Sequence, residues 1–237
     1  MHFVSSGCSF TYDNHTWPFH FAKKMKYAHY PMGLGSNGNE HIARRAIYQV
    51  NDLFKNNVES KDIVVGVMWS AANRASFYVE NSFVLNQLSK PNISEASHLA
   101  WPKNDPAGKW VLINASFPSR FSTNHYKIYT NNTFDLIRTY ENILRLQNYL
   151  KVNNIKYFFS NMNQSTFDES NVNTMQTEYL KEMVDWTRFV PVKGCYEWSR
   201  DNMPNDFPTP GDDHPSGKQH EAFAENVVIP FYNNLPV

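Results

Sequence analysis

Asp62-Ile63-Val64-Val65-Gly66-Val67-Met68-Trp69 is the stretch of this chain that decides its fold. Its apolar residues follow one another without the alternation that marks a strand with one face in water. A continuous apolar run of this length is typical of a strand buried on both faces. Such strands occur in parallel sheets covered by helices on both sides, so the stretch predicts an α/β fold.

Shorter apolar runs and helical patterns alternate on either side of this strand. We expect further strands at Phe3-Val4, 26–30, 155–159 and 189–192, and helices over 39–54, 133–150 and 175–186. The alternation predicts a three-layer α/β/α architecture around a doubly wound, parallel, five-stranded sheet. Residues 75–132 fit no strand–helix unit, so we expect one domain over 1–237 with an insertion after the third strand.

Three short signals predict where helices begin. Thr16-Trp17-Pro18 has the form of a helix start, because proline is tolerated in the first turn. Thr133 is a candidate N-cap for the helix over 133–150. Ser216-Gly217-Lys218-Gln219 has the capping-box form and opens a C-terminal helix.

The composition argues against several classes of protein. Lys plus Arg and Asp plus Glu both total 22, and this zero net charge disfavours binding to nucleic acid or an anionic membrane. The longest apolar runs are far shorter than the roughly 20 residues of a membrane helix, and no signal region begins the chain. Two cysteines make no disulfide framework. We therefore expect a globular protein of a reducing compartment, with no cofactor.

Four polar clusters follow the predicted strands or precede the last helix: 7–11, 33–39, 69–74 and 211–216. They are rich in Ser, Gly, Asn and His. Because ligands of doubly wound folds bind at the carboxyl ends of the strands, we expect these clusters to converge on one edge of the sheet.

In these clusters the sequence resembles the SGNH (GDSL-type) hydrolases. Gly7-Cys8-Ser9 is similar to their first block, Gly-Asp-Ser, with Cys8 in place of Asp. Gly35-Ser36-Asn37-Gly38-Asn39 resembles the glycine block that precedes a helix, and Asp212-Asp213-His214-Pro215 resembles the last block. In the third block Ala71 stands where the family has asparagine. The Gly-Cys-Ser-Phe-Thr form resembles a branch often encoded by bacteriophages.

The resemblance implies a flavodoxin-like fold and a serine esterase. Ser9 is then the nucleophile, and His214 is the base that a serine hydroxyl needs. A carboxylate must hold the imidazole in the right tautomer. Residues i and i+2 of an extended segment point the same way, so Asp212 is the better partner than Asp213, although the family has its Asp three residues before the His.

The oxyanion hole is expected to use backbone N–H groups of Ser9 and Gly35, with Asn73 as the nearest amide in the third block. Asn39, at the start of the next helix, competes with Asn73 as a side-chain donor and as a substrate contact. Arg74, just beyond a buried strand, is a candidate substrate-binding residue. The expected substrate is a small-molecule or glycan ester, with O-acetylated carbohydrate favoured because the family commonly deacetylates glycans.

Several other interpretations remain open. Cys8 is a rival nucleophile beside Ser9, and Asp212, His214 and His220 together could bind Zn²⁺, although we expect no metal. The aromatic side chains of the insertion could stack on sugars or cover the sheet edge: Trp101, Trp110, Phe117 and Phe121. The second function class is a catalytically weak or inactive protein of this fold that binds glycan without turnover or belongs to a virion. In either class we expect a cytoplasmic or virion-associated protein.

Overall fold

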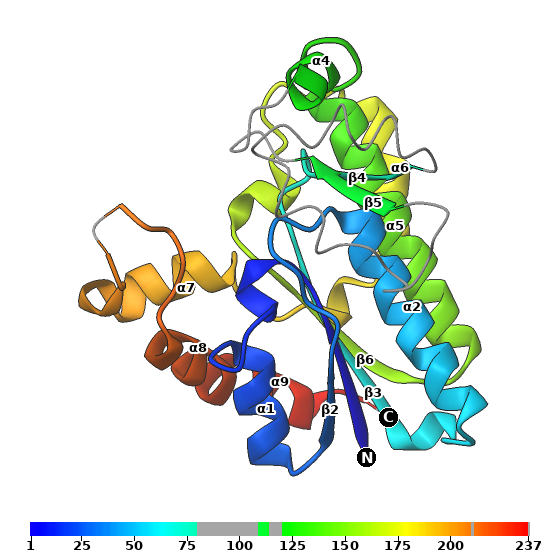
Figure 1. Ribbon diagram of the computed structural model, residues 1–237, viewed down its shortest axis with the longest axis vertical. Helices are drawn as coiled ribbons and strands as arrows, with labels where there is room; N and C mark the ends of the chain where they lie inside the picture. The colour runs from blue at the N-terminus through cyan, green and yellow to red at the C-terminus, as the bar shows by residue number, and fades with distance from the viewer. Residues whose placement is uncertain (80–108, 114–119, 210, 237) are drawn as a thin grey trace.

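The computed structural model describes residues 1–79, 109–113, 120–209 and 211–236, and at its centre lies a parallel sheet (Figure 1). The sheet has four strands in the order β2-β1-β3-β6. They are β1 (His2–Ser6), β2 (Ala28–Pro31), β3 (Ile63–Trp69) and β6 (Lys156–Asn161). The chain places β2 on one side of β1 and then β3 and β6 on the other side, which is the order of a doubly wound sheet. The predicted α/β fold is therefore confirmed.

The fifth strand, expected at 189–192, is reduced to one parallel bridge between Phe159 and Phe189. Val190 N–H donates to Phe159 O at 2.9 Å, but Pro191 has no N–H with which to continue the ladder. Val192 N–H instead donates to Val190 O at 2.8 Å, and this bond closes a γ-turn. The segment 189–192 therefore lies beside β6, where the fifth strand was expected, but it forms only one bridge and no strand.

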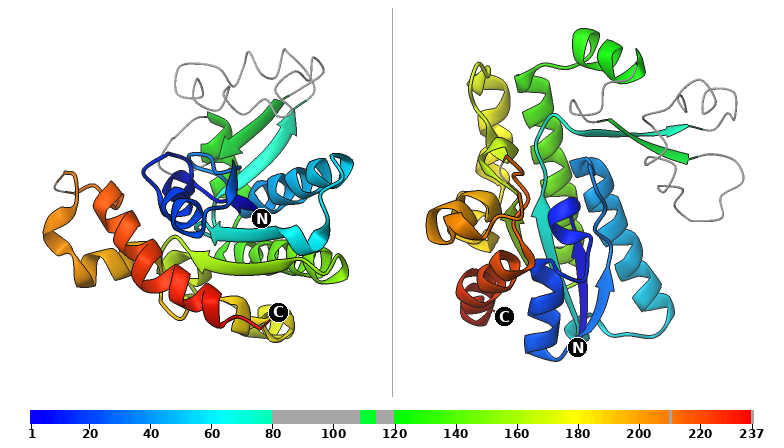
Figure 2. Two further views of the ribbon diagram at one scale, coloured as in Figure 1. Left: turned by 90° about the horizontal axis from the view of Figure 1, so that it is seen from below. Right: turned by 60° about the vertical axis from the view of Figure 1, so that its left-hand side comes forward.

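Helices cover both faces of the sheet (Figure 2). One face carries α2 (Asn39–Lys55), α5 (Asn132–Val152) and α6 (Thr174–Met183). The other carries α1 (Trp17–Met25), α7 (Cys195–Asn202), α8 (Gly217–Phe223) and α9 (Ile229–Asn234), with the π-helical η7 (Ala224–Val228) joining the last two. No helix in the described ranges is long and apolar enough to cross a bilayer.

Some of the helix starts and ends predicted from the sequence agree with the structure, and others differ. Thr16 precedes α1 and Ser216 forms the predicted capping box with Gln219. The prediction of Thr133 as a cap is wrong: the Asn131 side chain accepts the Phe134 N–H at 2.9 Å, and Thr133 Oγ1 accepts an N–H from the loop before α6 instead. Helix α6 ends at Met183, short of the predicted residue 186.

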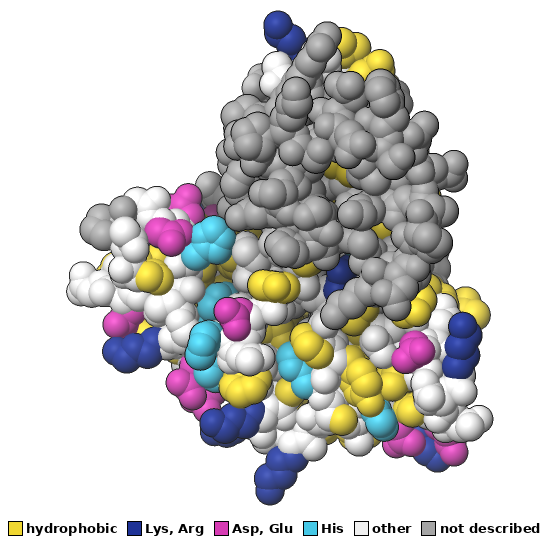
Figure 3. All heavy atoms as spheres, viewed as in Figure 1, with side chains coloured by type: hydrophobic (Ala, Val, Ile, Leu, Met, Phe, Trp, Pro, Cys, Tyr) yellow, Lys and Arg dark blue, Asp and Glu magenta, His cyan; other side chains and the backbone are white. Residues whose placement is uncertain are grey.

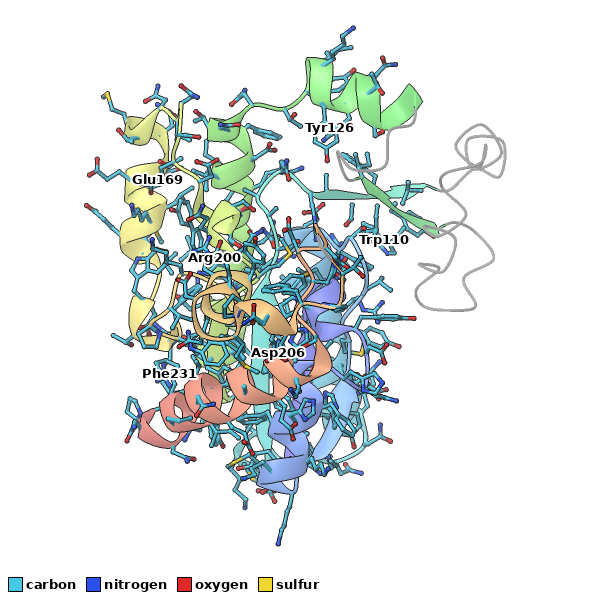
Figure 4. All side chains as sticks on the ribbon, turned by 90° about the vertical axis from the view of Figure 1, so that its left-hand side faces the viewer. Trp110, Tyr126, Glu169, Arg200, Asp206 and Phe231 are labelled. Carbon is cyan, nitrogen blue, oxygen red and sulfur yellow. The ribbon has the colours of Figure 1, made fainter. Side chains whose placement is uncertain are left out.

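The described part of the insertion is an antiparallel pair, β4 (Ala75–Val79) with β5 (Lys109–Ile113), followed by α4 (Arg120–Ile128). Trp110 on β5 stacks on His41 and lies 3.9 Å under the Arg44 guanidinium, both on α2 (Figure 4). This aromatic residue therefore covers a helix of the main domain. Trp101 and Phe117 lie outside the described residues, as does the side chain of Phe121.

Strand β3 is buried on both faces, as its sequence predicts. Val65 and Val67 face the α2/α5 side, whereas Val64 and Met68 face the α1/α8 side. Gly66 lies on the α1/α8 side between the rings of Phe3 and Phe158, which are parallel to within 8°. A Cβ at this position would lie 2.6 Å from Phe158 Cζ and 2.8 Å from Phe3 Cε2, so glycine leaves the space that the two rings fill.

Gly66→Ala should lower the free energy of unfolding by about 1–3 kcal/mol, because the added methyl overpacks a buried site. Urea denaturation followed by circular dichroism measures the change. Gly217→Ala in the first turn of α8 is the matched control, since its Cβ would meet only ordinary contacts, 3.4 Å or more from His15. The control should leave stability unchanged or raise it, and equal losses in both variants would contradict this account of Gly66.

Candidate active site

Ser9 stands at the point where β1 ends and the short 3-10 helix η1 (Ser9–Thr11) begins. Thr11 N–H donates to Cys8 O at 2.9 Å, which closes the turn. A Cβ at Gly7 would clash with the Thr11 side chain and lie 2.9 Å from Met68 O, so this tight turn requires glycine. The turn leaves Ser9 partly exposed while Cys8 and Phe10 are buried.

His214 and Asp212 form a chain of hydrogen bonds with Ser9. Ser9 Oγ lies 2.9 Å from His214 Nε2, and His214 Nδ1 lies 2.8 Å from Asp212 Oδ1. A carboxylate accepts only, so Nδ1 carries the proton and Nε2 presents its lone pair to the serine hydroxyl. The same Asp212 oxygen accepts the His214 backbone N–H at 2.9 Å. These two bonds hold the pKa of Asp212 below its usual range, and the bond from the His214 backbone has the larger effect.

Asp213 is directed elsewhere. Burial raises the pKa of Tyr196, and the nearby Asp213 carboxylate raises it further. Of the two neighbouring aspartates, the structure brings only Asp212 to the imidazole, and the i, i+2 argument from the sequence selects the same residue. In Figure 3, several histidine and acidic side chains lie next to one another on the left of the molecule, and others lie at its lower right.

The Phe10 ring contacts the exposed His214 imidazole on one side and the buried His220 on the other. The sequence suggested no role for Phe10, whereas His220 was a candidate Zn²⁺ ligand. The Phe10 ring lies 5.2 Å from the His214 ring and 5.8 Å from the His220 ring, measured between centroids. Burial lowers the pKa of His220 to about 3, and its Nδ1 faces Cys195 Sγ at 3.8 Å. His220 is therefore neutral, and it is buried with its Nδ1 turned toward Cys195.

The loop after β2 carries Gly35 toward Ser9. Met32 N–H donates to Ser5 O at 2.7 Å and Leu34 N–H to Gly7 O at 3.1 Å, so the parallel pairing continues past the end of β2. Asn37 Nδ2 also donates to Gly7 O, at 3.2 Å. In the described structure neither Ser9 N–H nor Gly35 N–H has a hydrogen-bond acceptor. Both are thus available as donors at this edge of the sheet.

Asn39 does not reach the site. It is buried, and its Nδ2 donates to Ser70 O at 3.2 Å and to Thr139 Oγ1 at 3.1 Å, while its Oδ1 accepts Ser70 N–H at 2.9 Å. These bonds use the whole amide to tie α2 and α5 to the end of β3. In this structure the Asn39 amide is therefore fully used within the fold, and this geometry does not support its expected role as a substrate contact or oxyanion donor.

The loop after β3 holds the other two candidates. Arg74 Nη1 donates to Ser70 Oγ at 2.8 Å, which folds the guanidinium back onto its own loop. Asn73 is exposed, and Tyr126 of α4 donates to its backbone oxygen at 3.0 Å. The Asn73 side chain lines a small pocket between this loop, α5 and the segment after β6. Its role as an oxyanion donor stays a prediction.

Ser9 differs from Cys8 and from a second Ser–His pair in that its side chain is partly exposed. Cys8 is fully buried, so no substrate reaches its thiol. Ser5 Oγ lies 2.8 Å from His29 Nε2, but Ser5 is also fully buried. Burial lowers the pKa of His29 to about 4, and no carboxylate contact to it is found in the described structure. Within the described ranges no cluster of three His, Cys, Asp or Glu could hold a metal ion.

Comparisons with known proteins give a family and two similar structures. Residues 5–233 match the model of DUF6071, a family of unknown function. No curated protein matches the chain. One similar structure is a proposed lipolytic protein of the G-D-S-L family from Desulfitobacterium hafniense DCB-2, with a TM-score of 0.48, 13% identity, and 94% of this chain and 95% of that chain covered.

The second structure is a member of the lipolytic protein G-D-S-L family from Veillonella parvula DSM 2008. It has a TM-score of 0.49 and 11% identity, with 99% of this chain and 100% of that chain covered. At identities this low, the chemistry has to be argued from the site itself.

Two glycines of the same loop should respond differently to alanine. Gly33→Ala should lower the free energy of unfolding by about 1–3 kcal/mol, because its Cβ would collide with the Thr11 carbonyl. Gly35→Ala should leave stability unchanged or raise it by up to about 1 kcal/mol, because no atom lies within 4 Å of that Cβ. Thermal and urea unfolding test the pair, and a large loss in Gly35→Ala would show that Gly35 serves the fold.

Proposed function

The chain belongs to DUF6071, a family of unknown function, and we propose that it is a serine hydrolase that cleaves carboxylic esters through an acyl-enzyme on Ser9. One observation carries the proposal: an unbroken chain of hydrogen bonds, 2.9 and 2.8 Å long, from the Ser9 hydroxyl through His214 to Asp212. The resemblance of its sequence blocks to those of the SGNH hydrolases supports the same assignment.

In the first half of the reaction Ser9 Oγ attacks the ester carbonyl carbon. His214 Nε2 takes the hydroxyl proton, and a tetrahedral intermediate forms with a negative carbonyl oxygen. The free N–H groups of Ser9 and Gly35 would donate to that oxygen, each with an effect of roughly 3–4 kcal/mol on the barrier. His214 then protonates the leaving alcohol, and the acyl group stays on Ser9.

In the second half a water molecule takes the place of the alcohol. His214 Nε2 removes a proton from water as it attacks the acyl carbonyl, and the same donors hold the second oxyanion. Collapse of this intermediate returns the proton to Ser9 Oγ and releases the carboxylic acid. Asp212 stays ionised throughout, fixes the tautomer and stabilises the imidazolium that forms in each half.

The favoured substrate is an O-acetylated carbohydrate. This choice rests on the family resemblance, in which glycan deacetylation is common. Arg74 is proposed as a substrate contact, although its guanidinium first has to leave Ser70 Oγ or reach past it. Asn73 is proposed as a third oxyanion donor, and its exposed side chain leaves it free to turn toward substrate.

Ser9→Ala should abolish labelling by a fluorophosphonate probe and lower kcat for 4-nitrophenyl acetate by about 10³-fold or more, because the nucleophile is removed. Cys8→Ala should keep most of both. The matched control is Ser5→Ala, which removes the other Ser–His hydrogen bond but no exposed hydroxyl. Labelling that survives in Ser9→Ala and is lost in Cys8→Ala would overturn the assignment.

Asp212→Asn should lower kcat by about 10²–10⁴-fold, because an amide that donates to Nδ1 favours the wrong tautomer. Asp213→Asn, one residue away, should change kcat less than about threefold, since the carboxylate bonded to His214 is that of Asp212. The measurement is the steady-state hydrolysis of 4-nitrophenyl acetate by both variants. A larger loss in Asp213→Asn would exchange the roles of the two aspartates.

A further inference from the structure

One segment of the chain carries both Asp212 and His214. It runs from Met203, where α7 ends, to Ser216, where α8 begins, and its described part projects from the molecule between these helices (Figure 1). The two side chains are well exposed, 42% for Asp212 and 55% for His214. Catalytic side chains keep their direction only when the residues around them are fixed, so the contacts at the ends of this segment decide where the imidazole points.

The Gln219 side chain joins the two ends of this segment. Its Nε2 donates to Met203 O at 2.9 Å, and its Oε1 accepts the Ser216 N–H at 2.7 Å. Ser216 comes two residues after His214. Gln219 is completely buried, so its amide has no water to bond with in place of these two partners. One amide therefore fixes the end of α7 to the start of α8.

The capping box of α8 requires only one of these two bonds. It needs a side-chain acceptor at the third helical position, and glutamate supplies one as well as glutamine does. Here Gln219 Oε1 is that acceptor, and Ser216 Oγ accepts the Gln219 N–H in return at 3.3 Å. The bond to Met203 O needs a donor, which an amide has and a carboxylate lacks. Glutamine thus makes a bond at this position that the helix start does not need.

Two other side-chain contacts reach the segment, and both are weaker. Lys218 Nζ lies 3.2 Å from Asp206 Oδ1, but the lysine side chain is 75% exposed, and exposed ion pairs contribute little (Figure 4 labels Asp206). The Phe207 ring meets the edge of the Tyr196 ring, with 5.8 Å between the centroids. Both contacts involve residues before Asp212, so neither holds the part of the segment that follows His214.

Proton transfer from Ser9 to His214 depends on this geometry. Ser9 Oγ lies 2.9 Å from His214 Nε2, and general-base catalysis needs about 2.6–3.2 Å between these atoms. A displacement of about 1 Å exceeds that range and lowers a rate by about 10²-fold. Asp212 moves together with the imidazole, because its Oδ1 accepts both the backbone N–H and the Nδ1–H of His214. The ends of the segment therefore position the pair as one unit.

We propose that Gln219 is a positioning residue of the reaction, which holds Asp212 and His214 toward Ser9 by tying Met203 O to the Ser216 N–H. The inference rests on the proposed esterase function and adds to it a residue that touches neither substrate nor the reacting atoms. Its effect belongs in kcat, which depends on proton transfer through His214, whereas KM depends on substrate contacts that Gln219 does not make.

The test begins with Gln219→Glu, which keeps the acceptor of the capping box and removes the donor to Met203 O. This variant should lower kcat for 4-nitrophenyl acetate, and the rate of labelling by a fluorophosphonate probe, by about 10–100-fold. The KM should stay within about twofold. A free energy of unfolding from urea denaturation accompanies each rate, so that loss of fold and loss of position are measured separately.

Gln147→Glu is the matched control. Gln147 lies on α5, which covers the other face of the sheet, and it is also buried. Its Nε2 donates to Met183 O at 3.2 Å, and its Oε1 accepts the Asp185 N–H at 2.8 Å. The substitution therefore removes the same kind of bond far along the chain from His214. It should lower the free energy of unfolding to a similar extent and leave kcat within about twofold.

A crystal structure of Gln219→Glu separates this inference from the proposed function, because it needs no activity. His214 Nε2 should lie more than about 3.5 Å from Ser9 Oγ, beyond hydrogen-bond distance. A wild-type protein that hydrolyses no ester would remove the proposed function, and this structure would still test the position of the imidazole. An imidazole that keeps its bond to Ser9 would overturn the positioning role.

Two kinetic results would overturn the inference and leave the esterase standing. One is an unchanged kcat in folded Gln219→Glu, and the other is an equal loss of kcat in Gln147→Glu. If Gln219→Glu does not fold, Gln219→Met takes its place, since it fills the same space and also lacks the donor. Failure of both variants to fold would show that Gln219 serves the fold alone, which also contradicts the proposal.

Discussion

Burial of β3 on both faces is the constraint on which the rest of the structure depends. Its residues alternate between two hydrophobic clusters, so helices must cover both sides of the sheet. Parallel pairing with β1 and β6 then brings three strand ends to one edge. Ser9, the loop through Asn73 and the segment through Ser165 all follow those ends, and the candidate chemistry lies where the strands stop.

The catalytic hydrogen bond of the proposal joins residues 205 positions apart in the chain. The Asp212–His214 turn is exposed, and the residues next to it in the chain and in space hold it in position. Pro215 is buried, the Ser216 capping box fixes the start of α8, and the buried Phe10 supports the imidazole. An exposed histidine held in this way keeps its geometry and stays open to substrate.

Local sequence patterns predicted the elements well because they report local physics. The β3 run, the α2 periodicity and the Ser216 capping box all matched. The choice of Asp212 over Asp213 also came from a local rule, the i, i+2 alternation, and the structure places Asp212 on the imidazole. The fifth strand is shorter than its apolar pattern predicts, because Pro191 has no N–H with which to continue the ladder.

Features made by several distant segments could not be predicted. Asn39 looked like a free donor, but its amide is taken up by Ser70 and Thr139, and the latter is 100 positions away. The contacts of Phe10 with two histidines and the small pocket beside Asn73 depend on tertiary packing in the same way. No spacing along the chain signals them, because each needs the assembled sheet edge.

The most direct test of the account is a crystal structure of the protein after reaction with a serine-reactive phosphonate. The account predicts a covalent bond from phosphorus to Ser9 Oγ, with the phosphonyl oxygen about 2.7–3.1 Å from the backbone nitrogens of Ser9 and Gly35. His214 Nε2 should lie beside the leaving-group position. An adduct on any other residue, or a phosphonyl oxygen turned to solvent away from both N–H groups, would contradict it.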